Sequence, residues 1–109
     1  MHRWLFLILA GWLVAAPVLA ADHVITAEDW SRPRSGKALL AMKPVKAAVQ
    51  EWRGEKDAHI VILYAGGDAG NLWALEVRDW LVALGIPSKD LDVRAGGPSD
   101  DRIVLSVES

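Results

Sequence analysis

The residues of this 109-residue chain whose types and spacing best suit ligand chemistry lie in the segment YAGGDAGNLWA, residues 64–74. Glycines let a loop adopt positive φ and bring a ligand close to the backbone. A helix that follows such a loop points free N–H groups and its positive dipole end at an anion. The candidate ligand-binding residues are therefore Gly66, Gly67, Asp68, Gly70 and Asn71. The alternative is a tight strand-to-helix turn with no ligand.

The type of ligand is only partly constrained by this loop. It has neither the lysine of a G-x-x-x-x-G-K-[ST] loop nor the spacing of G-x-G-x-x-G, so the pattern does not indicate a nucleotide phosphate. A carboxylate or a polar sugar-peptide fits equally well. Asp68 would recognise an amine, and backbone N–H groups would be the donors to an anion.

No pattern in the chain predicts a catalytic or metal site. There is no cysteine, and no serine lies in a G-x-S-x-G turn. His23 and His59, with scattered carboxylates, do not have the spacing of zinc ligands. We therefore expect a non-enzymatic protein with no cofactor and no metal. The alternative is a small enzyme, or an enzyme subunit, that binds an anionic substrate at the same glycine-rich loop.

The first twenty residues have the pattern of a secretory signal peptide. A basic start precedes an apolar run, which Pro17 ends, and small or compact residues follow at 18–20. We expect cleavage after Ala20 or Ala21 and a periplasmic mature protein. The alternative is an uncleaved anchor, because residues 4–21 are long enough to span a bilayer.

The charge balance disfavours some partners. The chain has 12 basic and 14 acidic residues. Loss of residues 1–20 removes only Arg3, so the mature chain has 11 basic and 14 acidic residues and a net charge of −3. Nucleic-acid binding requires clustered cations, so we expect no nucleic acid as a partner, and no membrane contact after cleavage.

A protein partner is a further alternative, with Trp30 and the edge of the last strand as its surface, because an unpaired edge can accept a strand.

Hydrophobic periodicity predicts the elements that hold the loop. We expect strands near 24–25, 59–65, 91–95 and 102–108, a short helix at 37–42 and longer helices at 44–52 and 71–84. Asn71 would cap the last helix, and Gly85 would end it. The last two strands should pair as a hairpin. The helix faces expected in the core are Val45, Ala48, Val49 and Trp52, then Trp73, Val77, Trp80, Leu81 and Leu84.

These elements predict an α/β fold, an α+β sandwich of order β-α-β-α-β-β. Two helices should pack on one face of a small mixed sheet, if each crossover is right-handed. Residues 1–20 are then the signal peptide, residues 21–36 an N-terminal strand and loop, and residues 37–109 the α/β domain.

The strand HIVILYAGGD and the segment VRDWLVALGIPSKDLDV resemble the OmpA-like domain of envelope proteins that bind peptidoglycan. The resemblance spans roughly residues 38–107 and depends on the Trp80-Leu81 and Gly85-Ile86 pairs and the strand LDVRAGG. It implies a cell-envelope binding module whose partner is peptidoglycan or an envelope protein. In that family an Asp and an Arg hold the diaminopimelate group of the wall peptide. Asp68 matches the Asp, but Trp73 stands at the Arg position.

Overall fold

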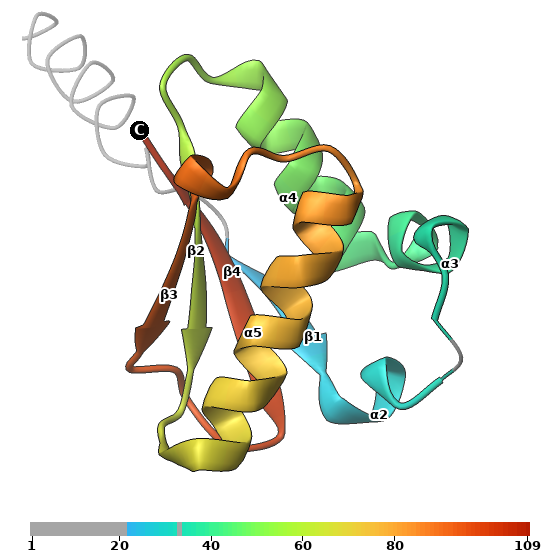
Figure 1. The fold of residues 1–109 in the computed structure, drawn as a ribbon, viewed down its shortest axis with the longest axis vertical. Coiled ribbons are helices and arrows are strands. Elements are labelled where there is room, and N and C mark those ends of the chain that lie inside the picture. The colour runs from blue at the N-terminus through green and yellow to red at the C-terminus, as the bar shows by residue number, and fades with distance from the viewer. Residues whose placement is uncertain (1–21, 33) are drawn as a thin grey trace, which may run out of the picture.

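The computed structural model describes residues 22–32 and 34–109, so the predicted signal peptide lies outside the described residues (Figure 1). This part of the chain has four helices and a four-stranded mixed sheet. The α+β class is as the sequence predicts, and the predicted order of the elements is matched only roughly. Its elements are β1 His23–Thr26, α2 Ala27–Trp30, α3 Gly36–Ala41, α4 Lys43–Gly54, β2 His59–Tyr64, α5 Gly67–Ala83, a 3-10 turn Ser88–Asp90, β3 Leu91–Ala95 and β4 Arg102–Glu108.

The strand order of the sheet is β1-β4-β2-β3. β2 and β3 are parallel neighbours, because α5 returns the chain to the same edge, and β4 lies antiparallel between β1 and β2. The predicted hairpin of the last two strands is therefore wrong. β4 is buried on both faces, at Ile103 and Leu105 on one and Val104 on the other, which suits a central strand. The prediction that the last strand offers a free edge is wrong for the same reason.

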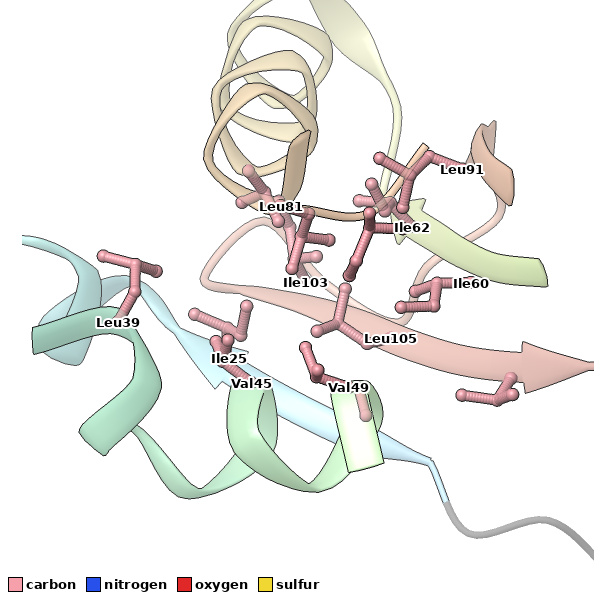
Figure 2. Packing of buried hydrophobic residues seen from close by; sticks show 14 of the residues in the cluster. Ile25, Leu39, Val45, Val49, Ile60, Ile62, Leu81, Leu91, Ile103 and Leu105 are labelled. Atoms are coloured by element: carbon pink, nitrogen blue, oxygen red, sulfur yellow. The ribbon is translucent and has the colours of Figure 1, made fainter. Parts of the chain in front are cut away.

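The core lies between one face of the sheet and the helices (Figure 2). α4 packs on β1 and β4, and α5 packs on β2 and β3, so both long helices cover one face as predicted. Ile60 and Ile62 of β2 meet Ile103 and Leu105 of β4 beneath Leu81 of α5. Trp52, Trp73 and Trp80 pack partly buried against this core.

The helix boundaries mostly follow the local sequence. Pro44 is the second residue of α4 and Gly54 its last, as expected of a proline tolerated only in a first turn. After α5, Gly85 has φ of 106°, and the N–H of Ile86 donates to the carbonyl of Leu81 over 3.1 Å, which is a Schellman-type end. The short helix α2 falls in a segment predicted as loop. Within the described part of the chain, no helix is both long and apolar enough to cross a membrane.

Candidate functional site

The glycine-rich loop forms the first turn of α5. The helix begins at Gly67 with Gly66 as its N-cap, four residues before the predicted start, and no side chain caps it. Gly66 and Gly67 have φ of 125° and 79°, values that L side chains rarely adopt. The free N–H groups of a first turn have no partner within the helix, so this end of α5 presents uncapped donors.

The predicted role of Asn71 as a helix cap is wrong. Asn71 lies inside α5, and its Nδ2 donates to the hydroxyl oxygen of Tyr64 over 3.1 Å. This hydrogen bond ties the first turns of α5 to the last residue of β2. Asn71 therefore helps to hold the loop in place and does not line the cavity described next.

A cavity of about 410 Å³ opens at the carboxyl end of β2. Gly66, Gly67, Asp68 and Gly70 line one side of it, so the structure brings four of the five predicted ligand residues together. Further lining residues come from the β3–β4 connection and from the start of β4. The cavity residues from these segments and from α5 beyond the loop are Trp73, Ser99, Asp100 and Arg102.

Gly97 determines where the β3–β4 connection passes. Its N–H donates to the carbonyl oxygen of Tyr64 over 2.8 Å. A Cβ at this position would lie 2.9 Å from the Tyr64 carbonyl carbon and 3.0 Å from the Leu63 oxygen. Only glycine allows two backbones to approach this closely without a shift. The Gly97 contact thus holds the β3–β4 connection against the end of β2, while Arg102 is held at the start of β4, where it pairs with Thr26 of β1.

Arg102 supplies a cation that the sequence analysis did not assign to the site. Its Nε lies 3.0 Å from Asp101 Oδ1 and one Nη lies 3.5 Å from Oδ2. This hydrogen-bonded pair raises the pKa of Arg102, so the guanidinium is charged. Its other Nη has no hydrogen-bond partner among the described residues. The sequence contains a signal for this role, because Arg102 begins the last strand at the end of the sheet where β2 finishes.

Trp73 occupies the position where the resemblance implies an arginine. It lines the cavity, and its indole Nε1 is buried with no hydrogen-bond partner among the residues that the structure describes. A buried N–H without a partner costs about 1–3 kcal/mol.

The cavity has a mixed charge. Asp68 and Asp100 are acidic, Arg102 is basic, and the end of α5 contributes a positive dipole. An amine can pair with the two carboxylates, while a carboxylate can accept from Arg102 and from backbone N–H groups. This arrangement suits a zwitterionic end group better than a simple anion or cation.

Trp30 does not form the exposed surface that a protein-partner hypothesis needs. Its side chain is 6% exposed and belongs to the core. The indole Nε1 donates to Glu76 Oε1 over 2.6 Å, and the Arg34 guanidinium lies 4.9 Å from the ring centroid. Arg34 also pairs with Glu76 over 3.2 Å. Trp30 therefore fixes the end of α2 to α5, and its prediction as a partner surface is wrong.

Neither His23 nor His59 lines the cavity at the loop. His59 begins β2, at the opposite end of the strand, beside a second cavity of about 390 Å³. The Nε2 of His23 lies 2.8 Å from Glu51 Oε1, between β1 and α4. Within residues 22–32 and 34–109, no group of three or more His, Asp or Glu side chains could hold a metal ion.

Comparison with known proteins does not assign the chain to a family. No protein-family model matches the chain, and no curated protein matches it.

Proposed function

We propose that this chain is an exported, non-enzymatic binding module of the cell envelope that recognises a zwitterionic end group at the loop cavity. The observation that supports it most is the meeting of Asp68 and Arg102, from segments 34 residues apart in the sequence, in one cavity of about 410 Å³. One side chain would pair with the ligand's amine and the other with its carboxylate.

The resemblance to OmpA-like domains suggests which zwitterion this is. In that family the ligand is the diaminopimelate group of peptidoglycan, which carries both an amine and a carboxylate. Trp73 at the family's arginine position would remove the cation from α5. Arg102 offers a replacement from the start of β4. The proposed ligand is therefore the peptide stem of peptidoglycan, bound by Asp68, the first-turn N–H groups of α5 and Arg102.

We propose in addition that the protein is located in the periplasm. A signal peptide cleaved after Ala20 or Ala21 would deliver the domain to the periplasm, where peptidoglycan is present. N-terminal sequencing of the protein recovered from cells tests the cleavage directly. A chain that begins at Met1 would contradict this part of the proposal.

Retention on purified peptidoglycan tests the proposed function. We expect the wild-type protein to sediment with the insoluble polymer and Asp68→Ala and Arg102→Met to lose most of that retention. Asp79→Ala and Arg53→Met are matched controls, because each removes a charge outside the cavity. Far-UV circular dichroism checks that all variants are folded. Absence of retention in the wild type, or equal retention in all five proteins, would overturn the proposal.

A further inference from the structure

Positive charge is concentrated in one short part of the chain. Residues 31–50 contain five basic residues and no acidic one, although acids outnumber bases over the whole sequence. The five basic residues are all exposed: Arg32, Arg34, Lys37, Lys43 and Lys46. This segment forms α3 and the first half of α4, and α3 lies at the outer margin of the fold, away from β3 (Figure 1). A local region of positive potential therefore exists on a domain whose net charge is negative.

A groove with an apolar floor lies within this region. Its volume is about 520 Å³. Three of the cations border it, with Asp29 as the one acidic residue that lines it. The apolar lining comes from Ala38, Leu39, Ala41, Met42 and Pro44. The neighbouring Leu40 is 44% exposed, so an apolar side chain is available to a partner beside the cations.

Three of the five cations are free for a partner. Arg34 is engaged with Glu76, and Arg32 lies 3.9 Å from Asp29. Lys37, Lys43 and Lys46 form no ion pair with any other residue that the structure describes. Lys43 and Lys46 are exposed at a spacing of three residues on α4, while Val45 and Val49 of the same helix are buried. Their ammonium groups are therefore directed to solvent.

We propose that this cationic surface, made of Lys37, Leu40, Lys43, Lys46 and the groove beside them, binds the face of an anionic phospholipid bilayer. Exposed cations near an anionic membrane each contribute attraction to it, and an apolar side chain among them can enter the headgroup region. The groove adds an apolar lining for acyl carbons, and Lys43 is the cation at its edge that is free to meet a phosphate. The contact is peripheral, so it needs no spanning helix.

This inference goes beyond the proposed function. It also replaces the expectation from the sequence that the mature chain has no contact with a membrane. The cationic surface and the loop cavity share no lining residue. The two proposals can therefore fail independently.

Vesicle co-sedimentation tests the inference. The probes are vesicles of phosphatidylcholine alone and vesicles containing about 40% phosphatidylglycerol, at low salt, where cation attraction is strongest. The test variant is the triple Lys37→Gln/Lys43→Gln/Lys46→Gln. The matched control is Arg53→Gln/Lys56→Gln/Lys89→Gln, which removes the same charge from exposed positions elsewhere. All proteins carry the same N-terminal segment, so its contribution cancels in the comparison.

We expect the wild type and the control to partition onto the anionic vesicles and the test variant to bind at least about ten-fold more weakly. Leu40→Ser should weaken binding without changing its dependence on salt. Circular dichroism confirms folding of each variant. Equal partition of the two triple variants, or no preference of the wild type for anionic vesicles, overturns the inference. An acidic protein would then be the partner to search for.

Discussion

The backbone N–H of Gly97 lies 2.8 Å from the carbonyl oxygen of Tyr64, and this contact joins the β3–β4 connection to the end of β2. Two segments more than thirty residues apart thereby line one cavity, with Asp68 from the first and Arg102 from the second. The proposed function depends on this contact as much as on either charged side chain.

Gly97→Ala should destabilise the protein by ~1–3 kcal/mol, because the new methyl group would press on backbone atoms that cannot move aside easily. The added Cβ would meet the Tyr64 carbonyl carbon at 2.9 Å. Gly54→Ala is the matched control, since nothing lies within 4 Å of a Cβ there and alanine favours a helix. Urea denaturation measures both. A Gly97→Ala protein as stable as the wild type would show that the connection is not held by this contact.

Glu76→Ala should lower the free energy of unfolding by ~1–2 kcal/mol, because it leaves the buried indole N–H of Trp30 without its acceptor. The cost stays modest since Glu76 is itself 44% exposed and solvent screens its pair with Arg34. Asp79→Ala on the same helix is exposed and should change stability by less than about 0.5 kcal/mol. Thermal denaturation measures the stability of the Glu76→Ala and Asp79→Ala variants. Equal losses in the two would contradict a stabilising hydrogen bond between Trp30 and Glu76.

Two adjacent leucines of α3 should respond in opposite ways. Leu39 is 1% exposed, so Leu39→Ala should cost ~2–4 kcal/mol through the cavity it leaves. Leu40 is 44% exposed, and Leu40→Ala should stay within about 0.5 kcal/mol of the wild type. The comparison is made by guanidinium denaturation. A large loss in both variants would mean that Leu40 is covered, which would also argue against the membrane-facing surface.

The Asp101 carboxyl should titrate below its ordinary pKa of 3.8, because the Arg102 guanidinium and then the Ser99 hydroxyl donate hydrogen bonds to its charged form. A carboxyl whose pKa is lowered by folding stabilises the fold above the unfolded pKa, and that stabilisation is lost as pH falls through the folded pKa. The relevant window is therefore below pH 3.8.

Titration of the Asp101 carboxyl carbon by NMR measures this effect. Arg102→Met should raise the midpoint toward the ordinary value, and Ser99→Ala should raise it less. An unchanged midpoint in Arg102→Met would show that the guanidinium does not hold the Asp101 carboxylate.

The sequence predicted those features that local chemistry determines. Pro44 lies in the first turn of α4, Gly85 ends α5, and the apolar run at 59–64 forms a strand, each as the sequence predicts. The pairing of β4 was missed because the alternating residues of β3 and the turn residues after it favour a hairpin locally. Burial on both faces of β4 favours the centre of the sheet instead.

The sequence predicts only part of the candidate site. Asp68 and the glycines are contiguous, so their pattern could be recognised in the sequence. Arg102 begins β4 at the end of the sheet where β2 finishes, but it lies 34 residues from Asp68, so the contiguous pattern of the loop does not include it. Trp30 was misassigned for a similar reason, since its acceptor Glu76 lies 46 residues away.

The most direct test of the central claim is an NMR titration of the protein with soluble peptidoglycan fragments that carry a diaminopimelate group. We predict that the indole N–H signal of Trp73 and the amide signals of residues 67–70 shift with fragment concentration in the wild type and in Asp79→Ala. In Asp68→Ala and Arg102→Met these shifts should be lost. Unchanged signals in the wild type, or shifts confined to residues around His59 at the other end of β2, would contradict the account.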